Sequence, residues 1–249
     1  MLTMLQDLRY AARQLRKSPG FTIAAVLTLA IGIGANTAIF SIMDAVVLRP
    51  LAVPDLKQVV TVYERQGNGD SRQVALANFA DWQRQNRSFE EMAVRSPVDM
   101  SLTGAGDAAH VQAEFTSPAF FSVLRTSAFV GRVFDQTETQ PGRNSVAVLS
   151  YGFWKSHFGS DAGVLGRKVE LDQHIYTVIG VMPKSMQYPS TADLYLPFAP
   201  TDAVLGNRGA HDYLVIGRLR HGVTAAQSQA EMSGIAKHLA EQYPETNQG

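Results

Sequence analysis

A run of 23 residues without a charged side chain, from Phe21 to Met43, constrains this chain more than any other feature of its sequence. Built as a helix rising about 1.5 Å per residue, the run is roughly 34 Å long and can cross a hydrocarbon core of about 30 Å. Its ten Phe, Ile, Leu and Val residues contribute roughly −3 to −6 kcal/mol to insertion, and Asn36, the threonines and the glycines reduce that sum without reversing its sign. We therefore predict a transmembrane helix over residues 19–47.

Two other interpretations of the run are a buried helix in a water-soluble core and a cleaved signal peptide. Core helices seldom extend this far without a charge. Small residues around Gly34 and Ala35 would suit a peptidase, but the apolar sequence continues past them to Val47. An uncleaved anchor is the interpretation that we favour.

The residues before the run set its orientation. This tail contains one acidic residue, Asp7, and four basic residues, Arg9, Arg13, Arg16 and Lys17. By the positive-inside rule the tail stays in the cytoplasm and residues 48–249 are translocated. In a bacterium this predicts an inner-membrane protein with a periplasmic domain. A domain without cysteine is stable there without disulfide formation.

Residues 1–18 are predicted to form a basic amphipathic helix on the cytoplasmic membrane surface. Apolar residues recur there at helical spacing: Leu5, Leu8, Ala12 and Leu15. The arginines fall on another face, so the helix can lie in the headgroup plane with its arginines toward anionic lipid. A basic topology signal without a further role is an equally open alternative. Ser18 is suited to cap a second helix that begins at Pro19.

Small residues in the apolar run predict a surface for helix packing. Ala30, Gly34 and Ala38 are spaced by four and share one helical stripe, with Asn36 nearby. Small side chains at this spacing let a second helix approach closely, and an amide in hydrocarbon favours a hydrogen-bond partner. The alternative is that they are simply small residues in an alanine-rich helix.

Composition excludes several classes of function. The chain has 22 basic and 22 acidic residues, so it lacks the broad basic surface of a nucleic-acid-binding protein. It has no cysteine, which excludes zinc–thiolate sites, iron–sulfur clusters and thiol nucleophiles. It has no G-x-x-x-x-G-K-[ST] motif, so any ATP hydrolysis linked to it must occur on another polypeptide.

No catalytic or metal-binding pattern emerges either. The six histidines are scattered without metal-ligand spacing: His110, His157, His174, His211, His221 and His238. Gly104 and Gly106 precede a strand-like stretch instead of a helix, which argues against a dinucleotide-binding turn. Ser160 does not stand in a nucleophile elbow. We expect no cofactor, no metal and no enzymatic activity.

Beyond the apolar run, short strands alternate with short helices, a pattern typical of the α+β class. We expect strands over residues 58–64, 92–103, 110–116, 146–149 and 213–219, and two strands within 169–182 joined by a turn at Asp172 and Gln173. Helices are expected over 118–124 and 151–158, residues 135–144 are expected to be a loop, and Gly67-Asn68-Gly69-Asp70 a turn.

Two helices in this part show signals at their ends. Asn78 is expected to cap a helix whose apolar stripe, Phe79, Trp82 and Phe89, belongs to the core. Thr224 and Gln227 form a capping box for the last helix. Its apolar positions are Met232, Ile235, Ala236, Leu239 and Tyr243, and Pro244 ends it.

Two long motifs carry a resemblance to a known family. DLRYAARQLRKSPGFTIAAVLTLAIGIGANTAIFSIMDAVVLRPL resembles the start of orphan permeases related to the MacB-type and FtsX-like ABC transporter permeases. VELDQHIYTVIGVMPKSMQYPSTADLYLPF, residues 169–198, resembles the late part of the MacB-like periplasmic core domain. The resemblance extends along most of the chain.

The resemblance implies a fold and a function for the chain. It implies one membrane helix followed by a periplasmic core domain over residues 50–249, in which 50–116 and 205–249 form a porter-like subdomain and 117–204 an inserted one. It also implies a permease that relays ATP-driven motion from a separate ATP-binding subunit to the periplasm. Its expected partners are the membrane, that subunit, a second copy or the remaining permease helices, and a periplasmic adaptor.

In that family a further strand and further membrane helices follow the last helix, whereas this sequence stops at Gly249. A chain that ended there would fit an alternative function. It would be a single-span, membrane-anchored periplasmic binding or adaptor protein that transports nothing.

Overall fold

The computed structural model divides the chain into two units, Met1–Pro50 and Leu51–Gly249. It describes residues 13, 16–43, 55–65, 69–103, 108–140, 142–186, 188–189 and 191–247. In the first helix, the side chains of Phe21, Ala25, Ala35 and residues 38–43 lie outside this description.

The apolar run of the first unit forms one helix, α2, Pro19–Met43. It begins where the sequence predicts, because the Thr22 backbone N–H donates to the Ser18 carbonyl at 3.0 Å and Pro19 needs no such partner. Residues 44–47 of the predicted span lie outside the described residues. Judged on the described residues, no helix combines the length and apolar character needed to cross a membrane. The membrane span therefore stays a prediction.

In the second unit, ten of the described strands form one sheet, and β2 (Glu64–Arg65) and β3 (Ser71–Arg72) form a separate antiparallel pair. The order along the sheet is β1 (Val59–Val62), β12 (His211–Leu219), β5 (Phe89–Thr103), β6 (Ala109–Thr116), β11 (Leu194–Pro197), β8 (Val146–Leu149), β10 (His174–Val181) and β7 (Val130–Gly131). β4 (Val74–Ala75) also pairs with β12, and β9 (Lys168–Leu171) pairs with β10 and β5. The β10–β8 and β11–β6 pairs are parallel.

Helices and 3-10 turns connect these strands. The helices of the second unit are α3 (Leu76–Gln85), α4 (Ala119–Val123), α5 (Tyr151–Phe158), α6 (Asp202–Gly206), α7 (Ala225–Gln242) and α8 (Pro244–Asn247). The 3-10 turns are η2 (Leu56–Gln58), η3 (Gln136–Thr139) and η4 (Ala162–Val164). The mixture confirms the α+β class predicted for this part of the chain.

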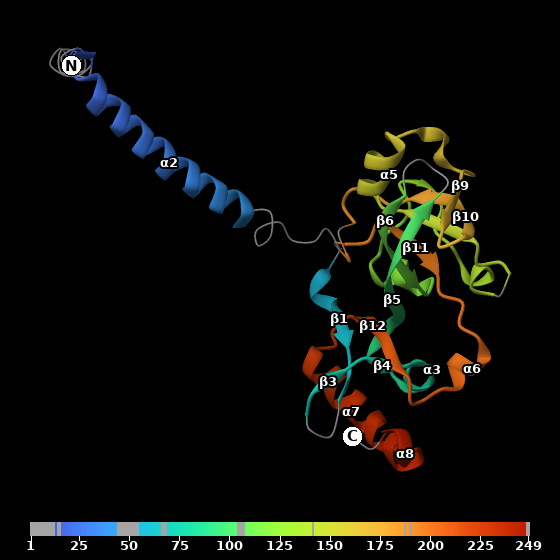
Figure 1. Ribbon diagram of the computed structural model, residues 1–249. Coiled ribbons are helices and arrows are strands. Elements are labelled where there is room, and N and C mark those ends of the chain that lie inside the picture. The colour runs from blue at the N-terminus through green and yellow to red at the C-terminus, as the bar shows by residue number, and fades with distance from the viewer. Residues whose placement is uncertain are drawn as a thin grey trace. The chain divides into compact units, whose positions relative to one another are not determined.

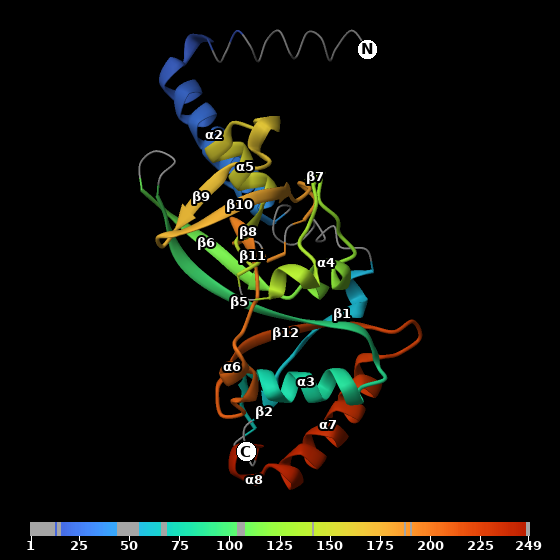
Figure 2. The same cartoon turned by 90° about the vertical axis from the view of Figure 1, so that its right-hand side faces the viewer.

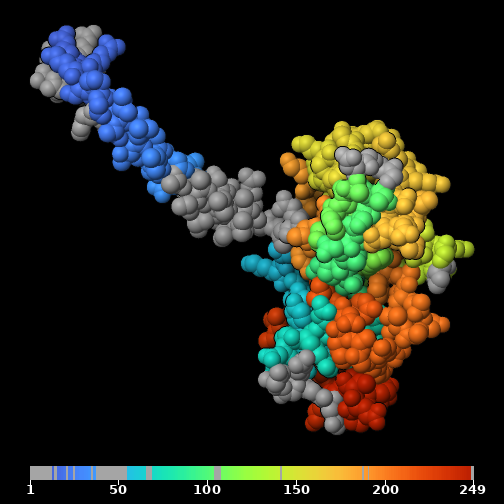
Figure 3. All heavy atoms as spheres, in the orientation of Figure 1, coloured from blue at the N-terminus to red at the C-terminus, as the bar shows by residue number. Residues whose placement is uncertain are grey.

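The long strand β5 joins the two ends of this unit (Figure 2). Its first half pairs with β12 from Phe89 to Arg95, and its second half pairs with β6 from Arg95 to Leu102. In Figure 1, α3 and α7 lie at one end and α5 at the other. Figure 3 shows the same separation on the surface, with residues of α3 and α7 at one end and those of α5 and β9 at the other.

The buried apolar side chains form three clusters, because successive side chains of a strand face opposite sides of the sheet. On β12, Val215 joins α3 and α7, while its neighbour Ile216 faces α4. On β8, Leu149 joins the cluster under α5, while Val148 also faces the α4 side. Successive side chains of a strand point to opposite faces, so one sheet serves cores on both sides.

Several local predictions are confirmed. α5 covers the predicted residues, and its Ser150 hydroxyl caps the helix by accepting from the Phe153 N–H. The capping box of Thr224 and Gln227 opens α7 as expected. Asp172 and Gln173 both have positive φ, 45° and 67°, which fits a tight hairpin turn between β9 and β10.

Three local predictions are wrong. Asn78 lies inside α3 instead of capping it; the cap position is Ala75, which makes no side-chain bond. Phe89 is buried as predicted but belongs to β5, because the helix ends four residues earlier at Gln85. Residues 135–144 contain the 3-10 turn η3, opened by an Asp135–Glu138 capping box that the loop assignment missed.

Candidate functional site

The residues singled out in the N-terminal unit are exposed wherever the structure describes them. Arg13, Arg16 and Lys17 are exposed, and Arg9 lies outside the described residues. Ala30, Gly34 and Asn36 are exposed on α2, and the side chain of Ala38 lies outside the description. A Cβ added at Gly34 would meet no atom within 4 Å, so this position is open to a neighbour.

The polar side chains of α2 differ in how they are satisfied. The hydroxyls of Thr22, Thr28 and Thr37 each donate to the carbonyl four residues earlier, at 2.9, 2.9 and 2.7 Å. Within the described residues, the amide of Asn36 makes no such bond. An apolar solvent tolerates a hydroxyl bonded within its own helix better than a free amide. Among the described side chains of α2, the Asn36 amide would therefore gain from a partner helix if α2 lies in an apolar medium.

The chain enters the second unit through a small cluster of charges. Asp55 adopts a left-handed conformation before η2, with φ 51°. Its carboxylate contacts Arg125 at 3.2 Å, and the same guanidinium contacts Glu90 of β5 at 3.2 Å. Leu56, the next residue, packs against the apolar cluster under α4.

Arg218 of β12 lies beneath this cluster and is fully buried. Its Nε donates to the Val123 carbonyl at the end of α4, at 2.7 Å. Burial and then the nearby charge of Arg125 lower the pKa of Arg218. Nothing in the local sequence marks this arginine, because an arginine within a strand pattern is normally expected on the exposed face.

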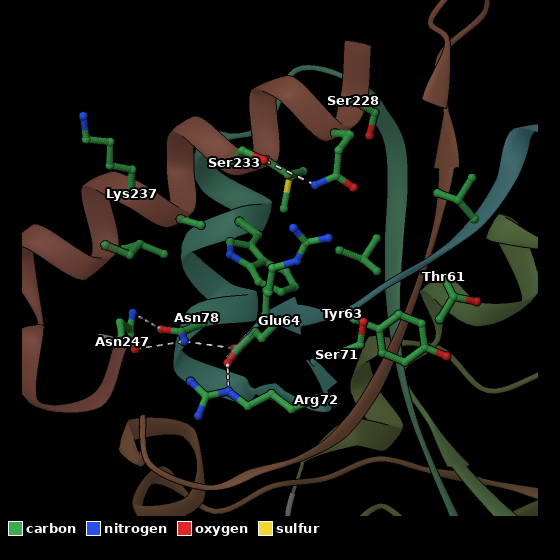
Figure 4. A pocket seen from close by; sticks show the side chains of 18 of the residues that line it. Thr61, Tyr63, Glu64, Ser71, Arg72, Asn78, Ser228, Ser233, Lys237 and Asn247 are labelled. Atoms are coloured by element: carbon green, nitrogen blue, oxygen red, sulfur yellow. Dashed lines mark hydrogen bonds and ion pairs between the residues drawn. The ribbon is translucent and has the colours of Figure 1, made fainter. Parts of the chain in front are cut away.

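A groove lies between the β1–β3 segment and α7, and Figure 4 shows it from close by. Its volume is about 920 Å³. Its apolar wall includes Val62, Trp82 and Met232. Polar groups surround this wall, with Tyr63 on one side and Lys237 of α7 on the other.

A buried carboxylate anchors one end of the groove. Glu64 accepts from the Ala75 backbone N–H at 3.0 Å and from the Asn78 amide at 2.9 Å. Its other oxygen is paired with Arg72 at 3.4 Å and with His211 at 2.5 Å. A buried carboxylate is tolerated only with such partners, so Glu64 ties the hairpin β2–β3 to α3 and β12.

The same network continues to the C-terminal helix. The amides of Asn78 and Asn247 bond each other in both directions, at 3.2 and 3.1 Å. Arg208 donates to Asn78 at 2.7 Å and to Asp81 at 2.6 Å, and its guanidinium stacks 3.7 Å from the centre of the Tyr243 ring. Asn78, assigned to a cap by its sequence position, instead fixes the end of α8.

A second buried ion pair joins β5 to β6. Arg95 donates twice to Glu114, at 2.7 and 3.1 Å, and its third nitrogen donates to the Tyr188 hydroxyl at 3.4 Å. Burial raises the pKa of Glu114 even though the bonds from Arg95 act in the opposite direction. Burial also raises the pKa of Tyr195 nearby. These groups hold β5 and β6 together.

The described residues contain no group of three or more carboxylates and imidazoles able to hold a metal ion. His211 is the partly buried histidine, and its partner is Glu64. Among the described residues that line the groove, no nucleophile is hydrogen-bonded to a base. The polar contacts of the groove join polypeptide segments of the domain to one another.

The described part of the chain thus combines one apolar helix with an α+β domain whose polar clusters join strands and helices to one another. The sequence model of the family described as "MacB-like periplasmic core domain" matches residues 22–235. The chain belongs to this family. No curated protein sequence matches it.

Three solved structures share the fold at low sequence identity. The extracellular domain of the ABC-type transporter YknZ from Gram-positive bacteria is 14% identical, with a TM-score of 0.57, over 76% of this chain and 97% of that one. The periplasmic region of MacB from Actinobacillus actinomycetemcomitans is 13% identical, with a TM-score of 0.57, over 79% and 91%. A domain of a protein described as a permease from Porphyromonas gingivalis is 18% identical, with a TM-score of 0.56, over 80% and 88%.

Proposed function

We propose that this chain is the permease subunit, or its N-terminal part, of a MacB/FtsX-like ABC transporter. The observation that carries the proposal is the extent of the family match, because residues 22–235 include most of α2 as well as the α+β domain. The shared fold of the YknZ and MacB domains supports it. The chain itself would be no enzyme; it would export or extract a substrate by changing shape.

We propose that α2 anchors the chain in a bacterial inner membrane, with the N-terminus in the cytoplasm and residues 48–249 in the periplasm. Six large apolar side chains of α2 are exposed: Ile23, Val26, Leu27, Leu29, Ile31 and Ile33. Exposed apolar side chains in this number favour a lipid environment over water. Arg13, Arg16 and Lys17, exposed just before α2, support the orientation.

Within the periplasmic part, we propose a porter-like subdomain of residues 50–116 and 205–249 and an inserted subdomain of residues 117–204. The buried residues of the cluster that α3 and α7 share all fall in the first set, which supports it. The cluster under α5 joins residues of 117–204 to Met100, Leu102, Val111 and Ala113, so the end of β5 and β6 pack with the inserted subdomain. β5 extends into both clusters and would transmit a displacement from one subdomain to the other.

In this proposal a separate ATP-binding subunit supplies the energy. Its closure would move the membrane helices, and α2 would pass that motion through the connecting residues to η2 and β1. ATP can shift the periplasmic equilibrium only if some contacts differ between the two states. We place such contacts on the stripe of Ala30, Gly34 and Ala38, where a second copy or another permease helix would pack.

Substitution of Gly34 tests this arrangement. Gly34→Leu should uncouple ATP hydrolysis from export while leaving membrane insertion intact, because leucine would block close approach of a partner helix. The matched control is Gly32→Leu. A Cβ added at either glycine meets no atom within 4 Å, but position 32 lies on a different face of the helix from position 34. Equal export by wild type and Gly34→Leu would contradict the packing role.

The alternative is a single-span anchor for a periplasmic binding or adaptor module that takes no part in transport. Affinity purification of the membrane-embedded chain separates the two functions. Co-purification of an ATP-binding protein with both the wild-type chain and the Gly32→Leu control supports the permease. Recovery of periplasmic proteins alone supports the anchor.

A further inference from the structure

The long strand β5 contributes to two separate apolar cores on one of its faces. The residues of this face, at every second position, are Met92, Val94, Ser96, Val98, Met100 and Leu102. Met92 and Val94 are buried in the cluster that α3 and α7 share, whereas Met100 and Leu102 are buried in the cluster under α5. The two clusters have no residue in common. Ser96 interrupts the apolar pattern between the two cores.

The opposite face of the sheet has no such interruption, because the cluster under α4 spans both ends of the domain. Ala93 of β5 and Ile216 of β12 contribute to it from the end with α7, and Tyr195 of β11 contributes from the end with α5. Phe120 of α4 is fully buried, and its ring centre lies 5.9 Å from that of Tyr195. The two ends of the domain are therefore packed together on this face.

β5 is held on both sides at Arg95, which lies between the two cores. Arg95 pairs with Leu214 of β12 on one side and with Thr116 of β6 on the other. Its guanidinium donates to Glu114, as described above, and lies 5.5 Å from the centre of the Tyr188 ring. Tyr188 in turn packs against the cluster under α4. Arg95 thus strengthens the connection between the two ends on the α4 side of the sheet.

Immediately after Arg95, one edge of β5 is open. β12 pairs with β5 up to Arg95, and β9 pairs with the same edge from Leu102 onward. Among the described strands, none pairs with residues 96–100 on this edge. Pro97 lies in this stretch; it is exposed and has no backbone N–H to donate. A stretch with a pairing strand on one side opens more easily than a stretch held on both sides.

We propose that Ser96 and Pro97 form a joint in β5, at which the end of the domain with α3 and α7 rotates relative to the end with α5 (Figure 2). The cluster under α4 and the Arg95–Glu114 pair hold the opposite face together, so the rotation opens and closes the face that carries Ser96. Hinges of this kind are a few residues that absorb backbone changes while the packed parts on either side move as units. The inference rests on the packing of the domain and not on the transport function.

Distances between spin labels in the full, membrane-embedded chain test the proposal, and the absence of native cysteine allows specific labelling. Lys155→Cys of α5 and Lys237→Cys of α7 place labels at exposed positions on the two ends. The control pairs each lie within one end: Lys237→Cys with Gln85→Cys of α3, and Lys155→Cys with Lys168→Cys of β9. Double electron–electron resonance should give a distance distribution at least about twice as wide between the ends as within either end.

A substitution at the joint makes the test specific. Ser96→Val places an apolar, β-branched side chain between Val94 and Val98. It should join the two cores and narrow the distribution between the ends to the width of the control pairs. Ser101→Val, in the same strand but on the opposite face, is the matched control and should leave that distribution unchanged.

Three results would overturn the proposal. They are a distribution between the ends as narrow as that of the control pairs, a Ser96→Val chain whose distribution is as wide as that of the unsubstituted joint, and equal narrowing by Ser101→Val. The first comparison needs no substitution at the joint. It therefore decides the proposal even if Ser96→Val folds poorly.

Discussion

The helix α2 and the strands of the domain contain the same apolar side chains but place them in opposite surroundings. Ile31 of α2 is 71% exposed, whereas Leu149 of β8 is 0% exposed. In α2 apolar residues occur all around the helix, so packing against one neighbour cannot cover them. In the domain they alternate along strands between two packed faces. The difference shows that the arrangement of apolar residues, more than their number, decides whether a segment can bury them within the chain.

The two regions also treat polar groups differently. The threonines of α2 bond carbonyls of their own helix, whereas Glu114 of the domain is bonded by Arg95 from the neighbouring strand. A hydroxyl in a helix can donate its hydrogen bond to a carbonyl of the same helix. A buried carboxylate needs a partner brought by tertiary structure.

The largest expected effect is on the buried ion pair. Arg95→Met leaves Glu114, whose side chain is 2% exposed, buried without its cation, and should cost about 3–5 kcal/mol of unfolding free energy. Urea denaturation monitored by tryptophan fluorescence measures this loss. The double variant Arg95→Met with Glu114→Leu should recover most of it.

The pH dependence of this variant gives a further check. Burial already holds the pKa of Glu114 above its ordinary value, and loss of Arg95 raises that pKa further. An acid with a raised folded-state pKa favours folding below its unfolded pKa of about 4.3 and opposes it as pH rises. The loss of unfolding free energy in Arg95→Met should therefore become smaller as the pH is lowered toward about 4. A loss independent of pH would mean that packing, and not the charge, is responsible.

Truncation of a leucine in each region compares them directly. Leu149→Ala should destabilise the domain by about 2–5 kcal/mol, because it leaves a cavity in the cluster under α5. Leu29→Ala should change the same unfolding free energy by less than about 0.5 kcal/mol, because Leu29 is exposed. Similar losses in both variants would show that α2 is part of the folded core.

A charge placed in α2 tests its insertion into the membrane separately from the stability of the domain. Leu29→Arg should weaken membrane insertion by about 3–4 kcal/mol, the difference between the leucine and arginine contributions, while domain stability stays constant. Resistance of the chain to alkaline extraction from membranes measures insertion. Leu205→Arg, at an exposed leucine of α6, is the control and should extract as wild type does. Equal extraction of both variants would count against the anchor.

The smallest effect is expected at η3. Hydrogen bonds from Arg132 lower the pKa of Glu138, so this carboxylate stabilises the fold above its unfolded pKa and loses that effect as pH falls through its lower folded value. Glu138→Gln should cost about 0.2–1 kcal/mol near pH 7, measured by urea denaturation. The difference between the two proteins should begin to shrink as pH falls below the unfolded pKa of about 4.3 and continue to shrink as it falls through the lower folded value. A constant difference down to pH 3 would contradict this assignment.

Local sequence was sufficient for much of the secondary structure. The caps at Ser150 and Thr224 and the turn at Asp172 are set by residues within a few positions of each other, so their patterns could be recognised. The long motifs also gave the family correctly. Asn78 was misassigned because its partners, Glu64 and Asn247, lie 14 and 169 residues away in sequence.

The groove and the ion pairs could not be predicted for the same reason. Arg95 and Glu114 meet only because β5 and β6 pair in one register. Arg218 is buried because β12 crosses the end of α4, which a strand pattern by itself does not reveal. A shift of one residue in either register would turn these side chains to the opposite face.

The sequence alone determines an uncharged apolar helix, a basic segment before it and an α+β domain of a recognisable family. These features depend on short-range patterns and on composition. The tertiary structure decided which charges are buried together, where α8 is fixed and which edge of the sheet is left open. Those features depend on contacts between residues far apart in the chain, whose pairing is selected by the packing of the whole domain.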